Sequence, residues 1–87
     1  MSKFTGAVIL EQGVTFAIVL VKRSATATQH TANETRAAFQ PYFPQLPIVL
    51  ATQDARGRFE YQGRRDLVRF LAALHPSQIP WKDYTTA

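Results

Sequence analysis

Two runs of apolar residues near the N-terminus follow the pattern of β-strands. Residues 4–10 and 14–21 are rich in Val, Ile and Phe, and they meet at residues 11–13, which are typical of a tight hairpin turn. The second run is apolar at almost every position. We therefore expect both of its faces to be covered and the strand to lie centrally in a sheet.

A helix is predicted after a hydroxyl-rich loop at residues 24–30. Thr31 and Glu34 have the spacing of a capping box, which predicts that the helix starts at Thr31. Pro41 removes one backbone donor and crowds the preceding turn, so the regular helix should stop near Gln40. An apolar stripe at helical spacing supports this helix, and it consists of Ala38, Phe39, Tyr42 and Phe43.

The second half of the chain predicts a hairpin followed by a helix. Residues 48–52 read as a short buried strand, residues 54–57 as a type I turn, and residues 58–61 alternate polar and aromatic side chains like a half-exposed edge strand. The helix is predicted from an apolar stripe after Gly63, formed by Leu67, Val68, Phe70, Leu71 and Leu74.

These elements predict an α+β fold in a single domain over residues 1–87. The order is β-β-α-β-β-α, with a four-stranded sheet and both helices on one of its faces. Residues 75–87 have no period, and we expect them to be irregular. They are too apolar for a free tail, so we expect Trp81 to dock this segment on the body of the domain.

Composition excludes several classes of protein. The chain of 87 residues has no cysteine, which excludes disulfides, thiolate nucleophiles, CxxC redox pairs and cysteine-based metal sites. Its longest uncharged apolar run covers residues 13–21, against the roughly 20 residues that a membrane helix needs. A signal peptide is disfavoured by Glu11 and by the basic residues 22–23. We therefore predict a cytoplasmic protein without a membrane partner.

The sequence offers few side chains that could act in catalysis. Two histidines and six carboxylates form no recognised catalytic or metal-ligating spacing, so we predict no catalytic residue, no metal and no cofactor. His30 precedes a predicted helix start and His75 follows a predicted helix end, where an imidazolium would favour the dipole. The alternative, an enzyme that uses either histidine, requires a carboxylate beside it in a pocket.

Charge is unevenly distributed. Residues 56–69 hold five arginines against Glu60 and Asp66, a local charge of +3 out of the total of +4. An arginine beside an aromatic face can hold a phosphate and stack a base. The alternative is a solvated face in which the two carboxylates pair locally. The candidate ligand or partner residues are Arg56, Arg58, Tyr61, Arg64, Arg65 and Arg69.

Aromatic residues form a second candidate surface. Phe39, Tyr42 and Phe43 lie among three prolines, and Trp81 follows Pro80. Such residues often line partner grooves, so we consider a partner or homodimer interface made of all four. The alternative is that they pack in the core, because a small sheet needs large side chains to seal its ends.

One stretch resembles a known family. Residues 46–50, the turn at Gly57, then Tyr61, Gly63 and the helix of residues 67–74 resemble the closing β-hairpin and helix of thioredoxin-like proteins, including the proline that opens the first strand. The CxxC motif is absent and one strand–helix pair is missing upstream. The resemblance implies a redox-inactive adaptor. The whole chain is also similar to small bacterial proteins that have no assigned activity.

Taken together, these patterns predict a small non-catalytic binding domain. Its contact surface is residues 56–69 and its partner is an acidic protein. A first alternative is nucleic-acid binding through the arginines, with Tyr61 as a stacking platform. A second alternative is the redox-inactive thioredoxin-like adaptor.

Overall fold

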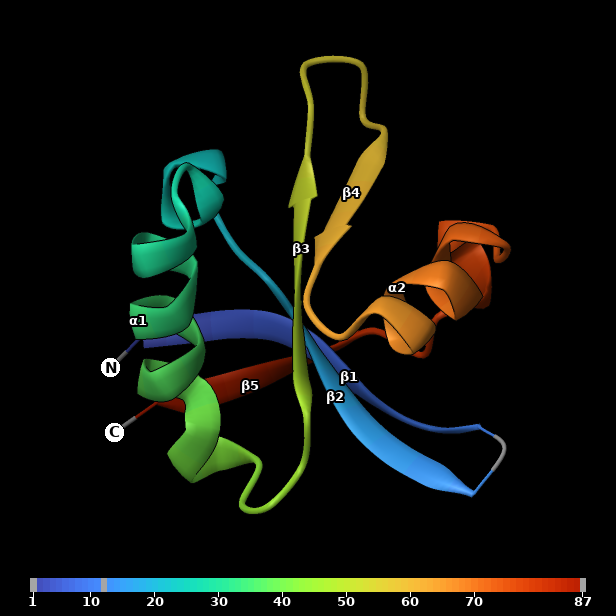
Figure 1. Cartoon of the computed structure of the whole chain (residues 1–87), viewed down its shortest axis with the longest axis horizontal. Coiled ribbons are helices and arrows are strands. Elements are labelled where there is room, and N and C mark those ends of the chain that lie inside the picture. The colour runs from blue at the N-terminus through green and yellow to red at the C-terminus, as the bar shows by residue number, and fades with distance from the viewer. Residues whose placement is uncertain (1, 12, 87) are drawn as a thin grey trace.

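The computed structural model describes residues 2–11 and 13–86. Within them the predicted α+β class is confirmed, because helices pack on a single sheet (Figure 1). The predicted four-stranded sheet is wrong: the sheet has five strands in the order β4-β3-β2-β1-β5. The elements are β1 (Ser2–Glu11), β2 (Val14–Leu20), α1 (Gln29–Phe39), β3 (Ile48–Gln53), β4 (Phe59–Gln62), α2 (Arg65–Ala72) and β5 (Lys82–Thr86), with 3-10 helices at Arg23–Thr26, Gln40–Tyr42 and Pro76–Gln78.

The N-terminal hairpin forms as predicted. β1 and β2 pair antiparallel, with Gly6 opposite Val19 and Glu11 opposite Val14. Gly13 has a φ of +79°, a value that favours glycine in a tight turn. Gln12, also in the predicted turn, lies outside the described residues. β2 is the middle strand of the sheet, and residues 16–19 are completely buried, as the continuous apolar run predicts.

α1 connects β2 to β3, which pair in parallel. The helix begins at Gln29, two residues before the predicted start, because Thr28 is the N-cap and its hydroxyl accepts a hydrogen bond from the Thr31 amide at 3.0 Å. The helix ends at Phe39, close to the predicted stop. Pro41 lies in the following 3-10 helix, where its missing N–H is tolerated.

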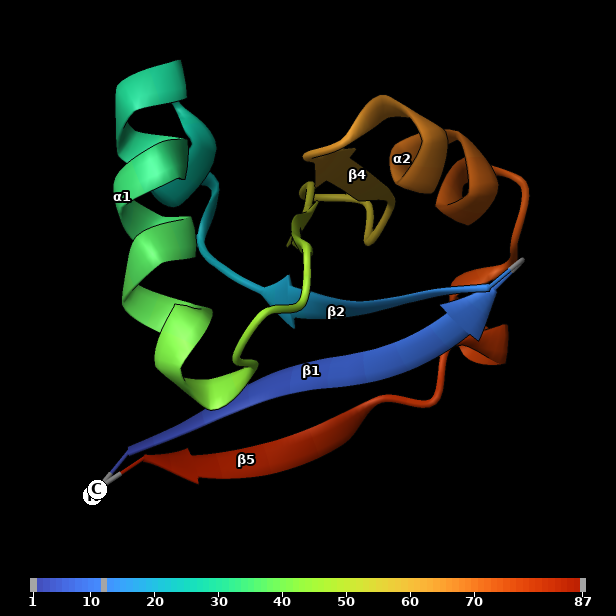
Figure 2. The ribbon, with the colours of Figure 1, turned by 60° about the horizontal axis from the view of Figure 1, so that its bottom comes forward.

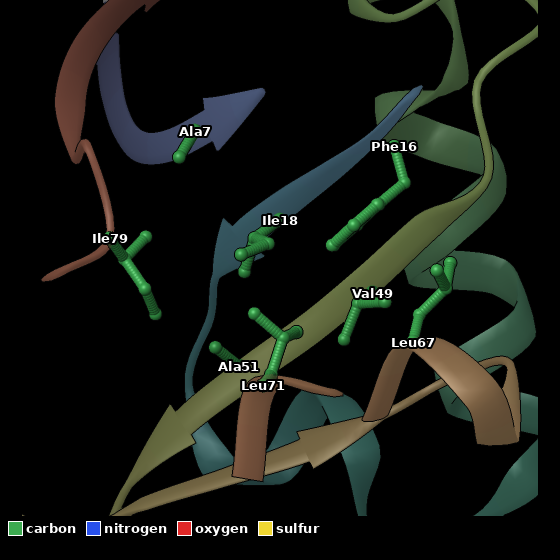
Figure 3. Close-up of a cluster of buried hydrophobic side chains, with 8 residues drawn as sticks. All are labelled: Ala7, Phe16, Ile18, Val49, Ala51, Leu67, Leu71 and Ile79. Atoms are coloured by element: carbon green, nitrogen blue, oxygen red, sulfur yellow. The ribbon is translucent and has the colours of Figure 1, made fainter. Parts of the chain in front are cut away.

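The prediction that both helices cover one face of the sheet is wrong. α1 packs on one face, where Ala32 contacts side chains of β2 and β3 such as Val19 and Leu50. α2 packs on the other face (Figures 1 and 2). Because β2 and β3 are apolar on both faces, each face must be covered. The core under α2 consists of Ala7, Phe16, Ile18, Val49, Ala51, Leu67, Leu71 and Ile79 (Figure 3).

The C-terminal segment differs from the expected irregular tail. Residues 82–86 form β5, which pairs antiparallel with β1 and places Ser2 opposite Thr86. The start of β1 and the end of β5 therefore lie side by side (Figure 2). Trp81, just before β5, is half-buried and stacks on Phe59 with a ring distance of 5.7 Å. Its Nε1 donates to the Pro76 carbonyl at 3.2 Å.

Candidate functional site

The five arginines of residues 56–69 lie in two groups. Arg56 and Arg58 lie in the turn between β3 and β4, whereas Arg64, Arg65 and Arg69 lie at the start of α2 and along it. Figure 1 shows the turn at the opposite end of β4 from the start of α2. All five side chains are exposed. The cluster in the sequence is therefore divided in space by the length of β4.

Arg58 is paired within its own turn. The Asp54 carboxylate accepts hydrogen bonds from the Arg56 amide at 2.8 Å, from the Arg58 amide at 2.9 Å and from Arg58 Nε at 2.9 Å. The bond from the Arg58 amide is the main cause that lowers the pKa of Asp54, and the other two act in the same direction. Arg58 therefore helps to hold the hairpin turn, and much of its charge is compensated.

Arg64 is paired as well. As the N-cap of α2 it donates from Nε and Nη2 to the two carboxylate oxygens of Asp66, both at 2.8 Å. This bidentate pair raises the pKa of Arg64 and is the main cause that lowers the pKa of Asp66. Asp66 lies in the first turn of the helix, where a carboxylate favours the dipole. A cation near a helix N-terminus is unfavourable, and the Asp66 carboxylate offsets this cost for Arg64.

Of the five arginines in residues 56–69, three have no ion pair with any residue that the structure describes: Arg56, Arg65 and Arg69. Arg65 and Arg69 are separated by four positions on α2, so they lie on the same side of the helix. These three side chains carry the charge that is available to an anionic partner.

Tyr61 does not present a free ring face as a stacking platform would. Its ring is half-buried and lies nearly parallel to Phe59 at a centroid distance of 6.3 Å. Its hydroxyl oxygen is buried and has no hydrogen-bond partner in the described part of the chain. Burial raises the pKa of this hydroxyl. Tyr61 therefore belongs mainly to the packing between β4 and α2.

A groove of about 700 Å³ separates β4 from the C-terminal half of α2, and we call it the β4–α2 groove. Its strand side is formed by the hairpin and by the rings of Phe59 and Tyr61, and its helix side by apolar residues of α2 and the segment after it. Sequence periodicity did not predict it, because it depends on how far β4 and α2 diverge. The helix-side residues are Val68, Leu71, Ala72, Leu74, His75 and Pro76.

Arg36 is a basic residue that sequence reasoning missed. It is half-buried, and its Nε donates to the Ile48 carbonyl at 2.9 Å while Nη1 donates to Asn33 Oδ1 at 3.0 Å. Nη2 contacts both the carbonyl and the Oε1 of Gln62. Burial lowers the pKa of Arg36. A cavity of about 330 Å³ joins Arg36 to Gln29 at the start of α1, to Gln62 at the end of β4, and to Gly63 and Arg64 just before α2.

A sequence signal for Arg36 does exist. Arg36 follows Ala32 by four positions and precedes Phe39 by three, so it falls on the stripe of α1 that faces the sheet. Ala32 is completely buried and Phe39 packs against the same core. A cation on a buried stripe must find polar partners, and Arg36 finds them at the ends of β3 and β4.

The predicted aromatic interface is divided between the two faces of the sheet. Phe39, Tyr42 and Phe43 surround the ring of Phe4, with centroid distances of 4.9, 5.3 and 6.1 Å. Phe43 is buried, whereas Tyr42 is 43% exposed. Trp81 packs with the core under α2 instead. The four residues therefore do not form one continuous surface, because Trp81, like Ile79, packs on the α2 side of the sheet before β5 begins.

The histidines lie in two separate exposed places. His30 Nε2 is 3.1 Å from Glu34 Oε1 on the surface of α1. His75 caps the 3-10 helix at Pro76–Gln78, where its Nδ1 accepts from the Ser77 amide at 3.1 Å. Within the described ranges, no three His, Cys, Asp or Glu side chains gather as a metal site would require.

Comparison with family models, with characterised proteins and with solved structures gives no match. The resemblance of residues 46–74 to thioredoxin-like proteins therefore stays a prediction. Among the described residues, no helix has the length and apolar character needed to cross a membrane. Any functional conclusion must therefore come from the geometry of the surface of residues 56–69 and from the β4–α2 groove.

Proposed function

We propose that this chain is a non-catalytic binding domain that docks an acidic protein segment on the surface of residues 56–69. One observation carries the proposal. Arg56, Arg65 and Arg69 are exposed and have no ion pair in the described part of the chain, and the hairpin and the helix that carry them line an apolar groove of about 700 Å³. Cations at the rim and apolar residues at the centre are the usual composition of a protein-binding surface.

An acidic protein segment fits this surface better than a nucleic acid does. Base stacking requires an exposed aromatic face, and the ring of Tyr61 is half-buried against Phe59. The arginines also lie in two groups at the two ends of β4 rather than along one continuous track. Apolar side chains of a protein segment can instead fill the groove between them.

A charge-reversal experiment tests the proposal. The double variant Arg65→Glu, Arg69→Glu is compared with Lys3→Glu, Lys82→Glu, which changes net charge equally but lies on β1 and β5, away from β4. A flexible peptide of Asp, Glu and apolar residues is titrated into labelled protein at about 50 mM salt, where surface charges are weakly screened. A single-stranded oligonucleotide is titrated in parallel.

We expect the peptide to shift amide signals of residues 56–69, and we expect the shifts to decrease as salt is raised. The α2 variant should lose about tenfold in affinity while the β1–β5 variant binds like the unmodified chain. An equal loss in both variants would show that only net charge matters and would contradict the proposal. Stronger binding of the oligonucleotide at the same residues would replace it with the nucleic-acid alternative.

A further inference from the structure

β4 is an edge strand, and half of its backbone groups point outward. The Asp54 amide donates to the Arg58 carbonyl at 2.9 Å, so hydrogen-bonded pairs alternate along the hairpin, and Glu60 and Gln62 are bonded to β3. The N–H and C=O groups of Phe59 and Tyr61 consequently point away from β3. In the part of the chain that the structure describes, these four groups have no hydrogen-bond partner.

The β4–α2 groove is bordered by side chains of the same strand. The side chains of Phe59 and Tyr61, the two residues whose backbone groups point outward, line the groove on the strand side. Val68 and Ala72 line it on the helix side. In a strand added next to β4, alternate side chains would project toward the same face as these rings. An added strand would thus bond the outward backbone groups of β4 and place alternate side chains in the groove.

Charge at the rim selects the occupant. Arg56 directly precedes Gly57, which lines the hairpin end of the groove. Arg65 precedes Val68 by three positions and Ala72 by seven, so it lies on the groove side of α2. The exposed carboxylate of Glu60 also lines the groove, and the two cations outnumber it. Neither arginine has an ion pair among the described residues. An acidic segment would be attracted. A second copy of this chain would place the same cations against one another.

We infer that β4 accepts an extended acidic peptide as an additional strand, with every second side chain of the peptide in the β4–α2 groove. The inference rests on the proposed function and specifies how the partner binds. Backbone hydrogen bonds to the edge would supply affinity, and the apolar groove would supply specificity.

Amide exchange of the protein tests the backbone pairing. The probe is a synthetic eight-residue peptide in which Glu alternates with Val and Phe. Adding it should slow exchange of the outward amides of Phe59 and Tyr61 by about tenfold or more. The amides of Glu60 and Gln62 already bond to β3 and serve as internal controls, so their exchange should change little. Peptide binding without slower exchange at the outward amides would overturn the inference.

Peptides with modified backbones test the same backbone pairing through the ligand. N-methylation removes a backbone donor and blocks pairing on that edge of the peptide. Methylating one alternate set of amides should abolish binding, while methylating the other set should leave it intact. If both modified peptides bind equally well, the peptide contacts β4 through side chains alone and the inference is wrong.

A pair of protein variants tests the groove. Ala72→Tyr places a ring in the groove and should weaken peptide binding by about tenfold. Ala73→Tyr makes the same change at the next position, which points away from the groove, and should have little effect. Both alanines are exposed, so both variants should fold. Equal effects of the two changes would contradict the assignment of the groove.

The outcomes separate this inference from the proposed function. Arginine-dependent binding of the peptide without protection of Phe59 and Tyr61 overturns only the strand addition. Absence of any binding to residues 56–69 overturns both. Protection of the same amides without peptide, increasing with protein concentration, would show that a second copy occupies the edge and would also overturn the inference.

Discussion

At the scale of single residues, Arg36 donates a hydrogen bond to a β3 carbonyl that a neighbouring strand could otherwise bond. The Pro47 and Ala51 carbonyls accept from β2, so the Ile48 carbonyl faces the side of β4. Ile48 lies beyond the last β3–β4 pair, Leu50 with Gln62, and Arg36 donates to it instead. All partners of the guanidinium are uncharged, so Arg36 adds positive charge at the Gln62 end of β4, on the face of the sheet opposite the β4–α2 groove.

Tyr61 gives the first prediction. Its hydroxyl is buried without a hydrogen-bond partner in the described chain, and an unsatisfied buried polar group is destabilising. Tyr61→Phe keeps the ring packed against Phe59 and removes this penalty. We expect the free energy of unfolding to rise by about 1 kcal/mol. Urea unfolding measures it, and Tyr42→Phe, at a position that is 43% exposed, is the matched control and should change little.

The same residue predicts a pH dependence. Burial raises the pKa of Tyr61 above the value of about 10 that it has in an unfolded chain. The fold therefore prefers the neutral phenol to the ionised one. Stability is unaffected by this preference below pH about 10, and it falls as pH rises from there through the folded pKa, because the unfolded chain ionises first. Tyr61→Phe should therefore lose less stability than the unmodified chain above pH about 10. Identical pH profiles would contradict this assignment.

At the scale of elements, the Asp54 turn gives the next prediction. Its carboxylate accepts from two amides and one guanidinium of the turn. Asp54→Ala should speed amide exchange of Arg56 and Arg58 by roughly fivefold, because the turn loses its internal acceptor. The control is Asp83→Ala, which removes an exposed carboxylate bonded to Thr5 on the opposite edge of the sheet.

Acid should reproduce the effect of Asp54→Ala in the unmodified chain. The pKa of Asp54 is lowered in the fold, so the contribution of its carboxylate is complete above the usual aspartate pKa and is lost as pH falls through the lowered value. The difference between the unmodified chain and Asp54→Ala should therefore disappear in that acidic range. A difference that stays constant down to strongly acidic pH would show that the carboxylate charge does not hold the turn.

The elements that could be predicted are those whose own side chains build the core. β2, β3 and the stripe of α2 are apolar at the spacing of their structure, so local sequence was sufficient. β5 escaped prediction because only Tyr84 of its five residues packs against a core cluster, and the strand exists by pairing with β1 at the other end of the chain. The placement of the helices on opposite faces also depends on topology, which local periodicity does not contain.

The candidate site shows the same division between composition and geometry. The arginines of residues 56–69 were visible as a charge cluster, but their pairing with Asp54 and Asp66 was set by turn and helix geometry. The β4–α2 groove required the relative placement of two elements. Sequence could therefore indicate a basic surface, whereas only the fold distinguishes compensated cations from available ones.

At the scale of the whole molecule, the pairing of β1 with β5 brings the ends of the chain together. Ser2 is opposite Thr86, and their side-chain oxygens are 2.6 Å apart. Joining the ends through a flexible linker of about six residues should therefore strain nothing in the fold while restricting the unfolded chain. For a closed loop of this length the chain-entropy model predicts a gain of about 4.6 kcal/mol in the free energy of unfolding, and strain in the linker would reduce it. Urea unfolding of the cyclic form is compared with that of a linear chain that carries the same linker, and equal midpoints would contradict the expected gain.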